Sequence, residues 1–273
     1  MSFSPCTGDT RGRPGPKPGR ARGDRCPGRD GSRTIRFVIK RLLASLSVGV
    51  AVATTGVVLT GAAPASAAPC SNVEVIFARG TAEPAPPVGL TGSAFLASLR
   101  SQLPGRSVAQ YGVNYPASAS FTDRIGTARS VITGVEDVQR RIAFLASACP
   151  GTRVVLGGYS QGAVVAGYAV SPSVTLPPEY RTYTPRPLAP ALLQKIAAVI
   201  LFAPPSARFL ADAGAPPVVV QPALTSRTAR YCIAGDNICN GARLAGPGPL
   251  HVLYAVNGDV IRGAGFAARA VRG

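Results

Sequence analysis

Residues 68–273 alternate between short apolar runs and longer stretches in which apolar residues recur every three or four positions. The short runs predict β-strands at residues 73–78, 107–115, 153–156, 197–202 and 228–233. The periodic stretches predict helices at residues 92–103, 123–148, 161–170 and 259–271, with a short helical segment before the fourth strand. Because the strands are continuous apolar runs, we expect a parallel sheet covered on both faces by helices. The pattern therefore predicts one α/β domain over residues 68–273.

The N-terminal region differs in composition from the rest of the chain. Residues 1–34 are rich in Arg, Gly and Pro and show no apolar periodicity. Four basic residues within 33–41, an apolar run at 42–60 and an Ala-x-Ala sequence at 65–67 are typical of a secretory signal peptide. An uncleaved membrane anchor is the alternative by length, although the Gly, Thr and Ser content favours cleavage. We expect a signal peptide over residues 35–67 and a secreted, extracellular product, and hypothesise that the preceding leader stems from a start codon assigned too early.

The formal net charge of +17 is densest in this N-terminal region. Residues 1–67 hold eleven Lys and Arg against three Asp and Glu, whereas residues 68–273 hold eighteen against nine. The arginines of the second part are scattered, while a nucleic-acid-binding protein usually shows a basic stripe or run. We therefore expect no nucleic-acid partner. A solvated basic surface of this kind favours anionic polymers or envelopes only through long-range attraction, which salt weakens.

Residues 158–162 have the sequence Gly-Tyr-Ser-Gln-Gly and lie between a predicted buried strand and a predicted helix. This G-x-S-x-G pattern is that of a nucleophile elbow, where the chain turns sharply and holds the serine in a strained conformation. Side chains at either glycine position would collide with the neighbouring strand and helix. The pentapeptide alone also occurs by chance, so its position after a buried strand is what makes Ser160 a candidate nucleophile.

A serine hydroxyl is a weak nucleophile near neutral pH and needs a base within hydrogen-bond reach. The chain contains one histidine, so an imidazole base for Ser160 can only be His251. A single histidine is more often structural, but His251 follows the last predicted strand, where the chain order Ser–Asp–His places the base. The acid between them can be Asp212, Asp236 or, less well placed, Glu179. Asp236 is favoured because it directly follows the fifth predicted strand, at the edge where such sites assemble.

An acyl-transfer site also needs donors aimed at the developing oxyanion, each worth about 3–4 kcal/mol of barrier. In a strand–elbow–helix site one donor is the backbone N–H of the residue after the nucleophile, here Gln161. The other comes from the turn after an early strand, where Thr81 offers both an N–H and a hydroxyl. Thr81 taken alone is an ordinary turn residue. Together, Thr81 and Gln161 are the candidates for an oxyanion hole.

Four cysteines follow the N-terminal region, namely Cys70, Cys149, Cys232 and Cys239. An even number in an exported chain predicts two disulfides, for which three pairings are possible. A local bridge between the last two and a long-range bridge between the first two is the natural pairing, and the local bridge would hold the Asp236 loop rigid. One histidine and no close Cys-x-x-Cys pair leave too few ligands for a metal site, so we expect no metal.

Four motifs together resemble cutinases, in the branch found in actinobacteria. They are Phe-Ala-Arg-Gly-Thr at 77–81, Gly-Tyr-Ser-Gln-Gly at 158–162, Cys-x-x-Gly-Asp-x-Ile-Cys at 232–239 and His-x-x-Tyr at 251–254. The resemblance implies a lidless α/β-hydrolase fold with a central five-stranded parallel sheet and helices on both faces. It also implies a triad of Ser160, Asp236 and His251, an oxyanion hole from Thr81 and Gln161, and the two disulfides above. A hydrogen bond from Asn114 to the Thr81 hydroxyl follows from the same resemblance.

Cutinases hydrolyse carboxylic esters through an acyl-enzyme and need no cofactor. The resemblance therefore implies a secreted serine esterase for cutin-like polyesters or short- to medium-chain acyl esters. It implies an open site flanked by apolar residues, here Leu244, Pro249 and Leu250, and transient contact with a lipid or polymer surface, and we expect a monomer. Residues 171–190 hold six prolines and are predicted to be a surface excursion that reshapes the crevice. Two alternatives stay open: an acetylxylan esterase on the same fold, and a non-catalytic surface lipid-binding protein.

Overall fold

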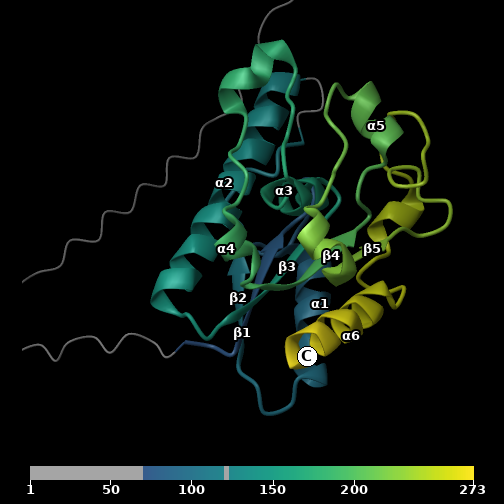
Figure 1. Ribbon diagram of the computed structural model, residues 1–273. Coiled ribbons are helices and arrows are strands. Elements are labelled where there is room, and N and C mark those ends of the chain that lie inside the picture. Colours follow the sequence, from purple (N-terminus) through teal and green to yellow (C-terminus); the bar gives the residue numbers. More distant parts are fainter. Residues whose placement is uncertain (1–69, 120–122) are drawn as a thin grey trace, which may run out of the picture. The chain divides into compact units, whose positions relative to one another are not determined.

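The computed structural model describes residues 70–119 and 123–273 (Figure 1). The predicted leader at residues 1–34 and signal peptide at residues 35–67 lie outside this part. The elements follow in the order β1 Val73–Ala78, α1 Gly89–Gln102, β2 Val108–Gly112, α2 Arg124–Ala148, β3 Arg153–Tyr159, α3 Gln161–Ala169, η1 Pro178–Tyr183, α4 Pro190–Leu193, β4 Ile196–Phe202, α5 Ala207–Asp212, η2 Pro222–Arg227, β5 Thr228–Tyr231, η3 Pro249–Val252 and α6 Asp259–Arg272, where η marks 3₁₀-helices. Among these helices, none combines the length and apolar character required to cross a membrane.

The strands form one parallel five-stranded sheet in the order β2-β1-β3-β4-β5, which confirms the predicted sheet. β3 is longer than predicted, because it continues through two glycines to Tyr159, the residue before Ser160. Glycine weakens the sequence signal of a strand, since it offers no side chain to pack. In the structure the absence of a side chain is required, because a Cβ on Gly157 would lie 2.7 Å from the ring of Phe77. The longer β3 carries the chain directly to the nucleophile candidate.

Helices cover both faces of this sheet (Figure 1). α2 and α3 pack together on one face, over a core that includes Ile76 and Leu156. α1 and α6 pack together on the other face, where Phe77, Phe95 and Phe202 form a cluster with ring centroids 5.7–6.4 Å apart. Ile76 and Phe77, which are neighbours in β1, thus pack into the cores on opposite faces of the sheet. Burial on both sides explains why the strands are continuous apolar runs.

The proline-rich segment at residues 171–190 is irregular apart from η1 and the segment's last residue, which begins α4. It is not only the surface excursion that its composition predicted, because Val174, Leu176 and Leu188 are buried against the core beneath α2 and α3. Its prolines lack the N–H groups that a regular helix or strand would use. The segment is therefore anchored to the domain by three apolar side chains while its backbone stays irregular.

Two disulfides are present in the structure. Cys70–Cys149 joins the residues before β1 to the end of α2, with 5.5 Å between the Cα atoms and a sequence separation of 79. Cys232–Cys239 closes a short loop after β5, with a sequence separation of 7. In the chain-entropy model the long loop contributes about 4–5 kcal/mol to stability and the short one about 2–3 kcal/mol. The short loop contains Asp236, so this bridge restrains the segment that holds the acid candidate.

Candidate active site

Ser160 occupies the junction between β3 and α3 and has an unusual backbone conformation. Its φ of 54° and ψ of −118° lie in a region that residues with a Cβ rarely adopt, at a cost of about 1–3 kcal/mol. A Cβ on Gly158 would lie 2.1 Å from the carbonyl oxygen of Gly162, and a Cβ on Gly162 would lie 2.0 Å from that of Ala78. Both glycines are thus required by close backbone approach, for the reason expected from the sequence. The turn presents the half-buried Ser160 at the carboxyl edge of the sheet.

Three side chains from separate segments meet at this elbow. The Nε2 atom of His251 lies 2.9 Å from Ser160 Oγ, and its Nδ1 lies 3.1 and 2.9 Å from the two carboxylate oxygens of Asp236. His251 comes from η3, and Asp236 from the loop closed by the short disulfide. Asp236 is fully buried and His251 is 5% exposed. This arrangement allows the imidazole to take a proton from the serine while the carboxylate faces its other N–H.

The two other acid candidates lie away from the imidazole. Asp212 is exposed at the end of α5 and accepts a hydrogen bond from the backbone N–H of Leu244. Glu179 is exposed in η1. Of the three acids that the sequence left open, the structure brings Asp236 to the histidine.

The buried carboxylate of Asp236 receives two hydrogen bonds besides its contact with the histidine. The backbone N–H of Ile238 donates to Oδ1 at 3.0 Å, and the hydroxyl of Tyr254 donates to Oδ2 at 2.8 Å. The sulfur of Cys239 lies 3.3 Å from Oδ2. Burying a carboxylate costs free energy unless its oxygens are hydrogen-bonded. The Asp236 loop and Tyr254 supply these donors.

Two tyrosine rings lie against the imidazole of His251, and sequence reasoning did not assign a role to either. Tyr159 donates a hydrogen bond to the carbonyl oxygen of His251 at 2.6 Å, and its ring centroid lies 5.2 Å from that of the imidazole. The ring of Tyr254 lies 5.7 Å from that of Tyr159. Burial raises the pKa of both hydroxyls, so both tyrosines remain neutral donors near neutral pH. The sequence signals available were the first x of G-x-S-x-G, which is Tyr159, and the third residue after the histidine, which is Tyr254.

Because β1 and β3 are parallel neighbours, the turn after β1, which contains Thr81, lies at the same edge of the sheet as the elbow at Ser160. The carboxylate of Glu83 accepts one hydrogen bond from the N–H of Gly80 and one from the N–H of Thr91 in α1, both at 2.8 Å. Glu83 thereby ties this turn to the start of α1. On the other side, Gln161 is the first residue of α3, so its N–H has no acceptor within that helix. Both candidate oxyanion donors therefore belong to segments that adjoin Ser160.

Asn114 does not orient Thr81 as the resemblance implied. Its side chain is exposed, and its backbone N–H donates to a buried carboxylate of α2 at 2.9 Å. Within residues 70–119 and 123–273 there is no hydrogen bond between Asn114 and Thr81. The turn is held instead by Glu83 and by the N–H of Ala82, which donates to the carbonyl oxygen of Ala117 at 3.1 Å. The pairing of β1 with β2 brings these segments together without the asparagine side chain.

Three apolar residues that follow His251 closely in the chain are exposed to solvent. Val252 and Leu253 follow the histidine directly and are 69% and 38% exposed, and Val256 is 78% exposed. We call these three residues the apolar rim. Of the apolar positions expected from the sequence, Leu244 and Pro249 are exposed and Leu250 is half-buried. The exposed apolar residues after the histidine, at the end of η3 and beyond it, are an addition to that expectation.

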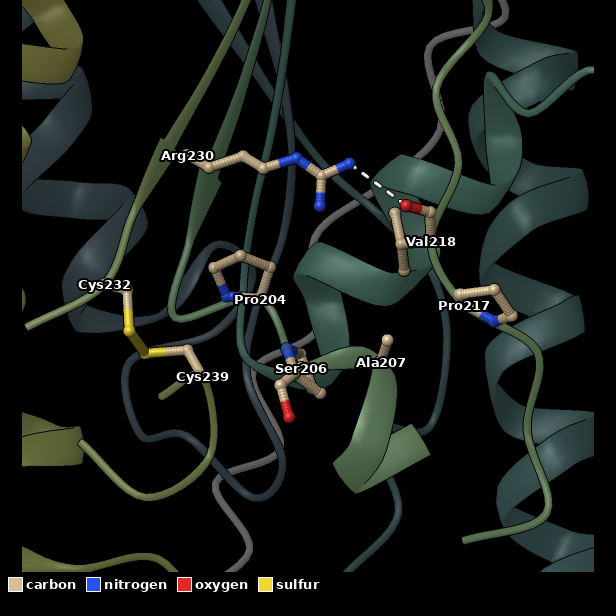
Figure 2. A pocket seen from close by; sticks show the side chains of 9 residues that line it. Pro204, Ser206, Ala207, Pro217, Val218, Arg230, Cys232 and Cys239 are labelled. Atoms are coloured by element: carbon tan, nitrogen blue, oxygen red, sulfur yellow. Dashed lines mark hydrogen bonds between the residues drawn. A yellow bond between two sulfur atoms is a disulfide. The ribbon is translucent and has the colours of Figure 1, made fainter. Parts of the chain in front are cut away.

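A pocket of about 250 Å³ lies beside the Asp236 loop (Figure 2). The Cys232–Cys239 disulfide forms one wall, and Pro217 and Val218 form the opposite wall. Arg230 reaches across one end and donates to the carbonyl oxygen of Val218 at 3.1 Å. No triad residue lines this pocket, so it is not where Ser160 would meet a carbonyl group. Within the described residues, no three His, Cys, Asp or Glu side chains gather to hold a metal ion.

Known proteins are similar to this chain in sequence and in fold. Residues 69–271 match the family model described as Cutinase. The probable carboxylesterase Culp7 of Mycobacterium tuberculosis is 46% identical over 170 residues, which cover 62% of this chain and 87% of that protein. The phospholipase Culp4 of the same organism is 41% identical over 200 residues, covering 73% and 80%. The structure of a Trichoderma reesei cutinase in complex with a phosphonate inhibitor is 31% identical, with a TM-score of 0.55 over 74% of this chain and 78% of that one.

Proposed function

Since the chain belongs to the cutinase family and is a carboxylic ester hydrolase, we propose that it cleaves esters through an acyl-enzyme formed on Ser160. One observation carries the proposal. The imidazole of His251 lies within hydrogen-bond distance of both the Ser160 hydroxyl and the buried Asp236 carboxylate. The elbow conformation of Ser160 supports it further, because a strained backbone of this kind persists where the site uses it.

In the first half of the reaction, Ser160 Oγ attacks the ester carbonyl carbon while His251 Nε2 takes the hydroxyl proton. The carbonyl oxygen becomes an oxyanion, which the N–H groups of Thr81 and Gln161 stabilise. Asp236 accepts the Nδ1–H and so holds the imidazole in the tautomer whose Nε2 is free to accept. When the tetrahedral intermediate collapses, the imidazolium gives its proton to the leaving alkoxide. The alcohol departs, and the acyl group remains on Ser160.

In the second half, water attacks the acyl carbon and passes a proton to His251. The second tetrahedral intermediate collapses with Ser160 as the leaving group, and the imidazolium returns the proton to its oxygen. The products are one carboxylic acid and one alcohol, and the enzyme is restored. Every proton moves through His251, from Ser160 to the leaving alkoxide in the first half and from water back to Ser160 in the second.

The substrates we propose are short- to medium-chain acyl esters and lipid or polyester surfaces, which the apolar rim contacts transiently. Val252 and Val256 expose apolar area next to the base, where the acyl chain of a bound ester would pass. The name of the relative Culp4, a phospholipase, is consistent with lipid esters. We further propose that the protein acts outside the cell, because two disulfides suit an oxidising compartment.

Acyl-chain preference tests this substrate class. We expect kcat/KM for p-nitrophenyl butyrate to exceed that for the acetate by about 3- to 10-fold. Butyrate has two more methylenes, and burying each one fully would contribute about 0.8 kcal/mol, so partial burial gives a ratio of this size. Initial rates of the purified protein, with S160A as the background control, measure this ratio. A clear preference for acetate would instead support an acetylxylan esterase. Absence of turnover for every ester would support a lipid-binding protein.

A further inference from the structure

Tyr254 lies behind the triad, and its hydroxyl contacts the acid. The residue is fully buried, and the hydroxyl oxygen lies 2.8 Å from Oδ2 of Asp236. The same Oδ2 faces Nδ1 of His251 at 2.9 Å. A carboxylate can only accept hydrogen bonds, so the phenol is the donor in this contact. Tyr254 and His251 therefore share one oxygen of the acid.

The hydrogen of this hydroxyl is committed to Asp236. The backbone N–H of Ile233 donates to the Tyr254 oxygen at 2.8 Å, so the phenol is an acceptor on that side. A tyrosine hydroxyl carries one hydrogen. Oδ2 of Asp236, at 2.8 Å, is the strong acceptor for it, whereas the disulfide sulfur of Cys239, at 3.4 Å, is a weak one. Ile233 stands just after β5, so its N–H fixes the phenol oxygen relative to the sheet. The hydrogen bond to Asp236 thus has a defined direction and little freedom to turn away.

Among the residues that the structure describes, two carboxylates besides Asp236 act on Tyr254 and Tyr159. The carboxylate of Asp259 in α6 acts on Tyr254 at longer range, and that of Glu83 acts on Tyr159. Burial raises the pKa of Tyr254, the N–H of Ile233 lowers it and the hydrogen bond to Asp236 raises it. The phenol of Tyr254 is therefore protonated in the folded enzyme near neutral pH.

We propose that Tyr254 is a positioning residue of the triad, whose hydroxyl orients the Asp236 carboxylate and limits how strongly that carboxylate attracts the imidazolium of His251. The inference rests on the proposed Ser160–His251–Asp236 mechanism. It adds a side chain that touches neither substrate nor the reacting atoms and acts through Asp236.

Removal of the hydroxyl has two consequences for the reaction. The negative charge that the phenol disperses remains on Oδ2 and stabilises the imidazolium, so the base stays protonated up to a higher pH. The carboxylate also loses one of the donors that hold its plane against Nδ1, so the imidazole is oriented less well for proton transfer. The first effect moves the acid limb of the pH profile upward, and the second lowers the plateau rate.

Tyr159 offers a matched control in the same cluster. Its hydroxyl also makes a buried hydrogen bond, at 2.6 Å, but to the backbone carbonyl of His251 and not to the acid. Y159F and Y254F therefore remove the same chemical group from neighbouring buried rings. Both are expected to lower the unfolding midpoint, whereas only Y254F removes a donor from Asp236.

The test is the pH dependence of kcat/KM for Y254F, Y159F and the unmodified protein. We expect Y254F to shift the midpoint of the acid limb to higher pH by about 0.5–1 unit and to lower plateau kcat by about 10-fold, with KM changed less than about 2-fold. We expect Y159F to leave that midpoint in place. A shift of equal size in Y159F, or no shift in Y254F, would overturn the inference.

A double-mutant cycle keeps the test decisive if Y254F is poorly stable. If Tyr254 acts through Asp236, adding Y254F to D236N should change kcat by less than about 2-fold, because D236N has already removed the carboxylate. Full additivity of the two losses would refute the inference. The outcome is separable from the proposed mechanism: if H251A is inactive and Y254F behaves like the unmodified protein, the triad stands and the role of Tyr254 does not.

Discussion

Replacing His251 by alanine is expected to lower kcat for p-nitrophenyl butyrate by about 10⁴- to 10⁶-fold, with KM little changed. Without the imidazole at 2.9 Å, the Ser160 hydroxyl has no base to take its proton. The oxyanion donors and the apolar rim remain, so a residual rate above that of water is expected. Initial-rate measurements on the purified variant check this loss.

The interpretation of H251A is helped by the composition of the chain. His251 is the one histidine of the sequence, so no second imidazole can replace it. Thermal unfolding of the variant controls for misfolding, since the histidine is buried against Tyr159. A folded H251A that keeps its rate within about 10-fold of the unmodified protein would mean that a different group is the base.

The second large effect is expected from D236N, which should lower kcat at neutral pH by about 10⁴-fold. The amide keeps the shape of the carboxylate, but it has one acceptor oxygen and one donor nitrogen. In the structure both carboxylate oxygens accept hydrogen bonds, from Ile238, Tyr254 and the imidazole. An asparagine cannot satisfy them all, and it favours the tautomer in which Nε2 is already protonated and so cannot take the proton from Ser160.

D212N is the matched control for this substitution. Asp212 is the other aspartate that the sequence allowed as the acid, and it is exposed in α5. We expect D212N to retain kcat within about 2-fold, because surface substitutions of this kind have small effects. The assignment of the acid would be wrong if D212N lost activity while folded D236N kept it.

Much of the site was predictable because its residues are tied to the sheet by local rules. A buried strand followed by G-x-S-x-G defines Ser160, since the glycines are required where backbones approach within van der Waals distance. The single histidine and the chain order then lead to His251, and the position after the fifth strand favours Asp236. Parallel strands bring their carboxyl ends to one edge, so these predictions did not need the details of packing.

The remaining features depend on tertiary contacts whose partners cannot be identified from the sequence pattern alone. The hydroxyl of Tyr159 contacts the backbone carbonyl of His251 and that of Tyr254 contacts the Asp236 carboxylate, whereas aromatic residues at such positions are more often simple core residues. The support of the oxyanion turn is another example. A family resemblance implied Asn114, whereas Glu83 holds the turn through backbone N–H groups that no sequence pattern identifies. The apolar rim lies after the histidine because η3 turns there.

Covalent labelling tests the central role of Ser160 most directly. The protein is incubated with a p-nitrophenyl alkylphosphonate, and the modified peptide is identified by mass spectrometry. The proposed mechanism predicts one phosphonyl group on Ser160, stoichiometric loss of esterase activity, no label in S160A and much slower labelling in H251A. Persistent ester turnover with Ser160 unmodified, or a label on another residue that accounts for the inactivation, would contradict it.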